Sequence, residues 1–115
     1  MKIGTDLVEL KRIDSHRLID RVLSEQEKEI YNNITNDKAK LAYFGGRFAA
    51  KEALFKAISH GDLKTNYRDI TVLNDEFGKP YIKTKLVDSQ NTILLSISHT
   101  DNYAVAMLII VEPKL

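Results

Sequence analysis

The sequence predicts an α+β fold in which an antiparallel sheet packs on one long helix and on shorter helices. An apolar strand-like run opens the chain, helix-like segments follow it, and the second half consists of strand-like runs joined by turns. Strands and helices that occur in separate blocks favour this class over the strict alternation that builds a parallel sheet. With 115 residues, the chain is expected to form a single domain over residues 1–115.

The first half of the chain carries one expected strand and two expected helices. Ile3 to Leu10 is apolar enough for a first strand. Ser24 and Glu27 have the spacing of a capping box, which predicts a short helix over Glu25 to Asn33. A longer helix is expected from near Asp37 to about Ile58, ending before the next glycine.

The second half is expected to form two hairpins. Four strand-like runs are Ile70 to Leu73, Tyr81 to Leu86, Thr92 to Ser98 and Tyr103 to Val111. The connections at 74–80 and 99–102 are rich in turn residues. The run Leu108 to Val111 is apolar at every position, which indicates either a central strand or a strand covered by another subunit.

Composition limits the classes of function. The formal net charge of +1 provides no global field for nucleic acid or membrane, so any charged partner must bind locally. The lack of cysteine excludes disulfides, thiolate zinc sites and a cysteine nucleophile, and it fits a reducing compartment. No apolar run approaches the ~20 residues that cross a bilayer, and the first residues do not have the pattern of a signal peptide. We therefore expect a soluble, cytoplasmic protein.

Asp6 is out of place in the first strand. It shares a face with Gly4 and Val8, although aspartate is disfavoured in strands. Either the strand ends there and Asp6 bonds nearby backbone amides, or the carboxylate has a function.

The long helix carries two charged residues beside its apolar stripe. That stripe consists of Leu41, Phe44, Phe48, Phe55 and Ile58. Lys51 lies inside the stripe and Glu52 at its edge, and unpaired burial of either charge would be costly. The structural alternatives are that Lys51 extends to solvent and that Glu52 forms an i,i+4 surface ion pair with Lys56.

The segment Ser96 to Thr100 combines hydroxyls with His99 where a strand meets its turn. His99 is either an ordinary turn residue or part of a phosphate-binding group of side chains and turn amides.

Together these residues suit a phosphate-transfer site if the fold brings them together. Asp6 and Glu52 would suit Mg²⁺, which takes one or two protein carboxylates and completes its shell with water and phosphate oxygens. Arg47, Lys51 and Lys56 would neutralise a pyrophosphate, and phosphoryl transfer needs mainly positioning and charge neutralisation.

The same segments resemble the signature blocks of the holo-acyl-carrier-protein synthases, the short bacterial type of the 4′-phosphopantetheinyl transferase superfamily. The similar blocks are Gly4 to Glu9, Gly46 to Ala53 with Lys56, Asp69 to Asp75, Gly78 to Tyr81, and Ser96 to Thr100. They occur in order and span nearly the whole chain.

The resemblance implies an enzyme that moves phosphopantetheine from coenzyme A to a serine of apo-acyl carrier protein for fatty acid biosynthesis. It makes Asp6 and Glu52 the magnesium ligands, with Glu52 or a metal-bound water taking the serine proton and Lys56 stabilising charge on the pyrophosphate. Further coenzyme contacts are then expected from Arg47, Lys51, His99 and Thr100. The segment 59–62 has one glycine where the family has a glycine-rich turn, so this part of the coenzyme site departs from the pattern.

The resemblance also implies partners. The family forms homotrimers with active sites at subunit interfaces, and its carrier proteins are acidic. Arg12, Arg17 and Arg21 belong to a basic cluster after Asp6, and they are expected to dock the carrier. Without the family, an ordinary solvated face, balanced by nearby aspartates, explains this cluster equally well.

Three other functions remain open on residues alone: a small nucleic-acid-binding module, a non-catalytic structural trimer, and a magnesium phosphotransferase of another type. The first is disfavoured by the near-neutral charge and by the lack of aromatic residues among the basic ones. The second leaves Asp6 and Glu52 without a purpose.

Overall fold

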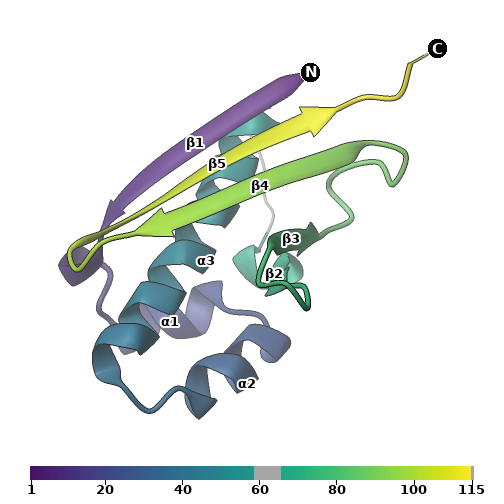
Figure 1. The fold of residues 1–115 in the computed structure, drawn as a ribbon. Helices are drawn as coiled ribbons and strands as arrows, with labels where there is room; N and C mark the ends of the chain where they lie inside the picture. The colour runs from purple at the N-terminus through teal and green to yellow at the C-terminus, as the bar shows by residue number, and fades with distance from the viewer. Residues whose placement is uncertain (59–65, 115) are drawn as a thin grey trace.

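A computed structural model describes residues 1–58 and 66–114 of the chain. Its main sheet has three antiparallel strands, β1 (Lys2–Glu9), β5 (Tyr103–Val111) and β4 (Thr92–His99), in the order β1-β5-β4 (Figure 1). Leu108 and Ile110 of β5 are buried between the neighbouring strands and the helices. The first of the two interpretations of this run, a central strand, is therefore confirmed.

Three α-helices precede the second half of the sheet. They are α1 (His16–Val22), α2 (Glu25–Asn33) and α3 (Asp37–Ala57). Ser24 and Glu27 form the expected capping box at the start of α2, and the Asn36 side chain caps α3. The bounds of α2 match the prediction, and α3 ends one residue short of Ile58. Two short 3-10 helices complete the order of elements. The first, η1 (Leu10–Arg12), follows β1, and the second, η2 (Tyr67–Asp69), precedes a small two-stranded hairpin.

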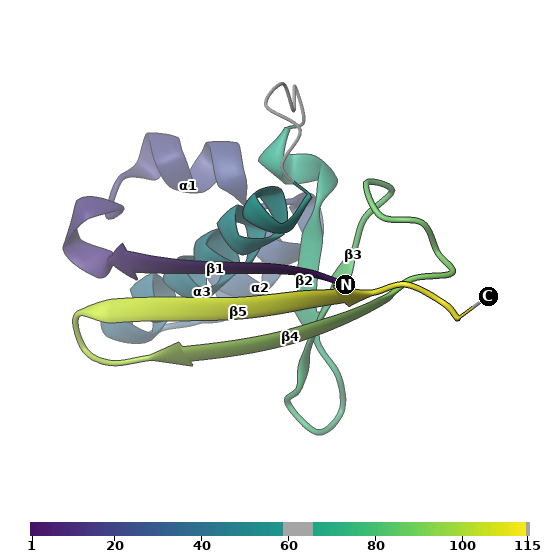
Figure 2. The same cartoon turned by 90° about the horizontal axis from the view of Figure 1, so that it is seen from above.

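A second, two-stranded sheet pairs β2 (Thr71–Asn74) with β3 (Pro80–Lys83). Its turn uses Gly78 at φ +82°, a conformation that suits glycine. The hairpin crosses the direction of the long strands (Figure 2). The predicted strand to Leu86 was too long, because the Thr84 hydroxyl accepts a hydrogen bond from the Leu86 amide and turns the chain.

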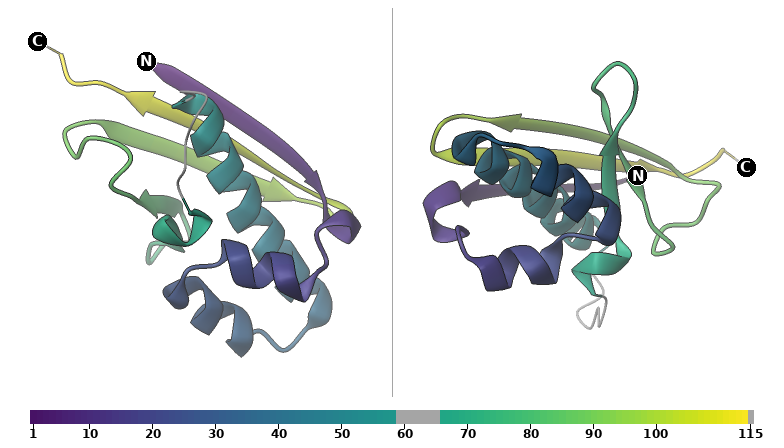
Figure 3. Two further views of the ribbon diagram at one scale, coloured as in Figure 1. Left: turned by 180° about the vertical axis from the view of Figure 1, so that it is seen from behind. Right: turned by 90° about the horizontal axis from the view of Figure 1, so that it is seen from below.

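The core lies between α3 and one face of the three-stranded sheet, which α3 crosses (Figure 3, left). Alternation along β5 buries Ala104, Ala106, Leu108 and Ile110 on the α3 side. The opposite face of the sheet is apolar but exposed. Its large exposed side chains include Ile3, Leu7, Leu94, Tyr103, Val105 and Met107.

Candidate active site

A glycine allows β1 to approach the backbone of α3 beside Asp6. A Cβ atom at Gly4 would lie 1.9 Å from the carbonyl oxygen of Ala53, so any larger residue would push the strand off the helix. Because strand side chains repeat every second residue, Asp6 lies on the same face as Gly4. The prediction that Asp6 shares a face with Gly4 and Val8 is confirmed, and on this face Gly4 and Val8 are buried while Asp6 is partly buried.

Asp6 forms an ion pair with Lys56 of α3. The Lys56 Nζ donates to Asp6 Oδ1 at 2.9 Å, with side chains 14% exposed for Asp6 and 56% exposed for Lys56. Asp6 therefore bonds a side chain 50 positions away rather than the nearby backbone. The lysine has further hydrogen-bonding capacity, since an ammonium carries three donors and its side chain is more than half exposed.

Glu52 lies one helical turn before Lys56, but the surface ion pair between them, the structural alternative for Glu52, is absent from the described residues. Glu52 Oε1 instead accepts a hydrogen bond from the Tyr67 hydroxyl of η2. Burial is the largest of the effects that raise the pKa of Tyr67, and the hydrogen bond and charge of Glu52 and the charge of Asp6 raise it further. The positive charge of Arg21 acts in the opposite direction and lowers it. Asp6, Glu52 and Arg21 are thus all close enough to the Tyr67 hydroxyl to act on it electrostatically.

The donor chemistry of this corner fits a hard divalent cation that is shared with a phosphate ligand. Two carboxylates from different elements, Asp6 of β1 and Glu52 of α3, lie around Tyr67 and Lys56. Within residues 1–58 and 66–114, no three His, Cys, Asp or Glu side chains form a complete metal cage. A two-carboxylate site suits Mg²⁺ better than a closed protein site does, because Mg²⁺ retains water and binds substrate phosphates.

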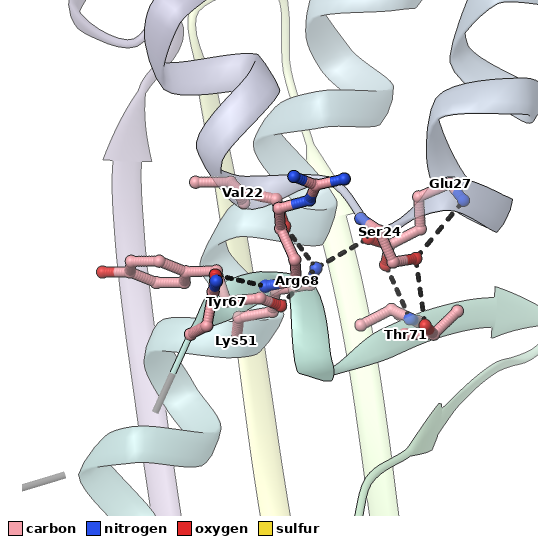
Figure 4. A network of polar contacts seen from close by, with 9 residues as sticks. Val22, Ser24, Glu27, Lys51, Tyr67, Arg68 and Thr71 are labelled. Atoms are coloured by element: carbon pink, nitrogen blue, oxygen red, sulfur yellow. Dashed lines mark hydrogen bonds and ion pairs between the residues drawn. The ribbon is translucent and has the colours of Figure 1, made fainter. Parts of the chain in front are cut away.

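Lys51 is a buried structural residue. Its ammonium donates to the Val22 carbonyl at 2.6 Å, to Glu27 Oε1 at 2.6 Å and to the Tyr67 carbonyl at 3.0 Å (Figure 4). Both Lys51 and Glu27 are 0% exposed. Desolvation lowers the pKa of Lys51, and the charge and hydrogen bond of Glu27 oppose this shift. All three donors of the ammonium therefore have partners inside the protein.

This arrangement corrects two interpretations of Lys51. The side chain does not extend to solvent, because it has no exposed surface. It also does not fit the predicted coenzyme contact, because an ammonium with three internal hydrogen bonds and no exposed surface cannot reach a ligand in this structure. The apolar stripe of α3 includes Lys51 because the lysine is paired within the core.

Glu27 is the acidic partner, and it connects three elements. Its Oε1 atom accepts from the Ser24 amide at 2.8 Å in addition to Lys51, while its Oε2 atom accepts from the Val72 amide of β2 at 2.7 Å. The Thr71 hydroxyl donates to the Ser24 hydroxyl at 2.9 Å beside it (Figure 4). The capping residue of α2 thus also holds α3 and β2.

Arg47 and His99, two of the predicted coenzyme contacts, line one open cavity of about 430 Å³ together with Tyr43, Asn74 and Pro80. The Arg47 guanidinium stacks on the Tyr43 ring at 4.6 Å and donates to the Asn74 side chain at 3.4 Å. Among the described side chains, the Arg47 Nε and the Tyr43 hydroxyl are buried polar atoms without a hydrogen-bond partner. A buried donor that lacks a partner is costly unless a ligand or water satisfies it.

Thr100 has a structural role in the turn after β4. Its hydroxyl accepts from the amides of Asn102 at 3.2 Å and Tyr103 at 3.1 Å. The side chain is exposed, and the hydroxyl can still donate one hydrogen bond. His99 and Thr100 therefore lie at the same end of β4, with only His99 lining the cavity.

The three arginines of the basic cluster are exposed. Arg12 pairs with Glu9 at 2.9 Å, whereas Arg17 and Arg21 lie one turn apart on α1. Arg21 also lines a surface cavity with Tyr67 and Arg68. Within the basic cluster, Arg21 thus lies beside Tyr67, whose hydroxyl bonds Glu52.

Sequence reasoning missed Glu27 and Tyr67 as site residues. Glu27 already had an explanation as a capping residue, although the buried position of Lys51 signalled that an acidic partner was needed. Tyr67 lies outside every predicted element, and no local pattern marks it. The expected departure at 59–62 falls outside the described residues.

A family model described as the 4′-phosphopantetheinyl transferase superfamily matches residues 2–108. A holo-[acyl-carrier-protein] synthase of Acholeplasma laidlawii is 47% identical over 111 residues, which cover 94% of this chain and 93% of that protein. The synthase of Onion yellows phytoplasma is 43% identical over 116 residues, covering 94% of this chain and 91% of that protein.

A solved structure shows the same fold. The chain is similar to a holo-(acyl-carrier-protein) synthase from Bacillus anthracis, crystallised in complex with CoA (3′,5′-ADP), with a TM-score of 0.86 and 34% identity. The match covers 97% of this chain and 96% of that one. The α+β fold class predicted from the sequence is confirmed by this similarity and by the arrangement of strands and helices.

Proposed function

The chain belongs to the 4′-phosphopantetheinyl transferase superfamily, as a holo-[acyl-carrier-protein] synthase, and we propose that Asp6, Glu52 and Lys56 carry its reaction. The enzyme transfers 4′-phosphopantetheine from coenzyme A to a serine of apo-acyl carrier protein and releases adenosine 3′,5′-bisphosphate. The single observation that supports the assignment is the placement of both carboxylates and the half-exposed lysine around one corner between β1 and α3.

The transfer exchanges one phosphorus–oxygen bond for another. The serine oxygen bonds to the β-phosphorus, and the bond from that phosphorus to the bridging oxygen breaks, with its electron pair leaving on the nucleotide. Glu52 accepts the serine proton, since only one of its oxygens is engaged by a hydrogen bond in the described structure. The Lys56 ammonium lies beside the site with exposed surface, where it stabilises charge that builds on the pyrophosphate.

Asp6 and Glu52 would hold Mg²⁺, which supplies charge neutralisation for the pyrophosphate when it is bound. Their oxygens come from two rigid elements, and Lys56 already compensates the charge of Asp6. The chain itself therefore orients the carboxylates before any ligand arrives.

The coenzyme nucleotide occupies the cavity that Arg47 and His99 line, with Thr100 at its margin. Arg47 supports this placement, because its guanidinium carries a permanent positive charge at the cavity and would attract an anionic nucleotide. The cavity volume of about 430 Å³ is in the range of small-molecule sites. Lys51 has no part in this contact, for the reasons given above.

The acidic carrier docks on the arginines of the basic cluster, Arg12, Arg17 and Arg21. They are exposed, and Arg21 lines a surface cavity together with Tyr67, whose hydroxyl bonds Glu52. Complementary charge at such a surface sets the association rate and its dependence on salt.

The chain acts as a single domain, residues 1–115, and assembles as a cytoplasmic homotrimer with active sites at subunit interfaces. Support for assembly comes from the apolar outer face of the three-stranded sheet, which includes Met107 at 50% and Leu7 at 65% exposure. Contiguous apolar faces of this kind mark interaction surfaces. No helix among the described residues has the length and apolar character to cross a membrane.

The test is a transfer assay with the purified chain. It is incubated with coenzyme A, Mg²⁺ and several apo carrier proteins, and each carrier is weighed by mass spectrometry. We expect one phosphopantetheine added per carrier, and no addition when Mg²⁺ is chelated. A carrier mass that stays unchanged with every carrier tried would refute the proposed function.

A further inference from the structure

We propose that Tyr67 is a positioning residue for Glu52. The Tyr67 hydroxyl fixes one oxygen of the Glu52 carboxylate and leaves the second oxygen for the cation and the serine proton. The inference rests on the proposed function of Glu52. The ring of Tyr67 packs against α3, but this packing does not account for its hydroxyl. The hydroxyl donates to Glu52 Oε1 and to no other side chain among those described.

Tyr67 is held by one face of α3. Its ring packs against Phe48, with ring centroids 5.8 Å apart, and against Phe55, edge-on at 5.3 Å. Its carbonyl accepts from Lys51 Nζ at 3.0 Å, and its hydroxyl donates to Glu52. The four α3 residues have the spacing i, i+3, i+4 and i+7, which places them on one side of a helix. Tyr67 is therefore fixed along two turns of α3.

The buried ion pair makes this attachment rigid. Lys51 is itself fixed by Glu27 and by the Val22 carbonyl, and its side chain is 0% exposed. The backbone of Tyr67 is thus anchored to the core through Lys51 (Figure 4). Its hydroxyl bonds Glu52, the residue that follows Lys51 on α3. A site group supported in this way keeps its geometry, because the supporting residue cannot shift on its own.

Tyr67 also competes with Lys56 for Glu52. Glutamate followed by lysine four residues later favours an ion pair along a helix, yet Lys56 bonds Asp6 and Glu52 bonds Tyr67. Without the hydroxyl, Glu52 would be free to turn toward Lys56. Such a pair would engage a Glu52 oxygen that the proposed cation site needs, so Tyr67 keeps Glu52 available.

The test compares Tyr67→Phe with the wild-type chain. The substitution retains the ring contacts with Phe48 and Phe55 and removes only the hydroxyl. Mn²⁺ binding in the presence of saturating coenzyme A is measured by electron paramagnetic resonance of the free ion. We expect affinity for Mn²⁺ to fall about tenfold, since supporting partners of metal ligands typically contribute this much. The kcat for transfer should fall similarly, and the KM for the carrier should stay unchanged.

Tyr31→Phe is the matched control, because it removes the same atom from a tyrosine on α2 that packs against the core. It should leave Mn²⁺ affinity, kcat and KM at wild-type values. A second comparison measures melting temperatures: Tyr67→Phe should lower the Tm in the wild-type background and not in Glu52→Ala, where the partner is missing. Should Tyr67→Phe not fold, Tyr67→Met provides a second chain without the hydroxyl.

Each outcome has one meaning. Wild-type Mn²⁺ affinity and kcat in a folded variant without the hydroxyl would overturn the inference while leaving the proposed function in place. An equal loss of Tm in both backgrounds would also overturn it, since Tyr67 would then act through another residue. A wild-type chain that transfers nothing would instead refute the proposed function.

Discussion

Lys51 and Lys56 of α3 each bond a carboxylate, but they differ in burial and in the number of their partners. Lys51 and Glu27 are 0% exposed, and the ammonium has three partners inside the protein. Lys56 is 56% exposed, and it contacts Asp6 at the edge of the helix–sheet layer. The first pair joins α2 to α3, and the second lies where β1 meets α3.

The difference shows how burial divides the roles of like residues. A buried charge must be fully paired, because its desolvation is otherwise uncompensated, and a fully paired group has nothing left to offer a ligand. A half-exposed lysine keeps donors for a substrate and retains its solvation. The signature block Gly46 to Ala53 with Lys56 therefore combines one lysine that is fully paired in the core with one that remains half exposed.

The largest effect is expected at the open corner. Asp6→Ala and Glu52→Ala should each lower transfer at least about a thousandfold, because charge stabilisation at such a site contributes several kcal/mol, and about 1.4 kcal/mol corresponds to tenfold in rate. The circular dichroism spectrum should remain that of the wild type. Near-normal turnover in either variant, measured by mass spectrometry of the carrier, would show that the metal assignment is wrong.

Exchanging the two lysines for methionine separates their roles. Lys51→Met should lower the free energy of unfolding by about 3–5 kcal/mol, because it leaves Glu27 as an uncompensated buried charge. Lys56→Met, the matched change on the same helix, should alter stability by less than about 1 kcal/mol and lower kcat. Urea unfolding and transfer rates check both. Adding Glu27→Gln to Lys51→Met should recover part of the stability, and equal stability losses for the two lysines would contradict the comparison.

A smaller effect is expected at the basic cluster. Arg21→Glu should raise the KM for the carrier about tenfold and leave the KM for coenzyme A nearly unchanged, because charge complementarity acts mainly on association. Arg17→Glu, one turn away on α1, tests whether the effect is general to the cluster or specific to the residue near Tyr67. Equal changes in both KM values would argue against docking at this surface.

The smallest effect is expected at a surface ion pair of the same length as the buried one. Lys28 and Asp20 are 2.6 Å apart, as are Lys51 and Glu27, but the Asp20 side chain is 74% exposed. Asp20→Asn should change the Tm by no more than about 2 °C at pH 7. The hydrogen bond from Lys28 lowers the pKa of Asp20 below 3.8, so its contribution exists above pH 3.8 and disappears as the pH falls through the lowered value. Thermal melts of both chains should therefore converge in acid.

Periodicity and capping were sufficient to predict most of the fold. The capping box located α2, and strand-like apolar runs on either side of a turn-rich connection located β4 and β5. The helix α1 was not among the expected helices, since seven residues with several charges carry little periodic signal. β3 was predicted too long, because the turn at Thr84 depends on a side-chain hydrogen bond that a propensity pattern does not contain.

The candidate site was predictable where a residue contradicts its local surroundings. Asp6 in a strand and Glu52 at the edge of an apolar stripe were such cases, and they lie in the same corner. Lys51 looked equally anomalous, but its explanation was a partner 24 residues earlier in sequence. Sequence spacing does not encode which long-range pair forms, so the same anomaly indicates chemistry at one position and core packing at the next.

Gly4 gives the corner a mechanical property. At this glycine, β1 approaches the backbone of α3 so closely that an added Cβ would lie 1.9 Å from the oxygen of Ala53. The contact is two residues before Asp6 on the strand and one residue after Glu52 on the helix. The separation of β1 and α3 at this corner is therefore set by a contact between two backbones. A single methyl group at position 4 would force the two elements apart, and with them the backbones that carry Asp6 and Glu52.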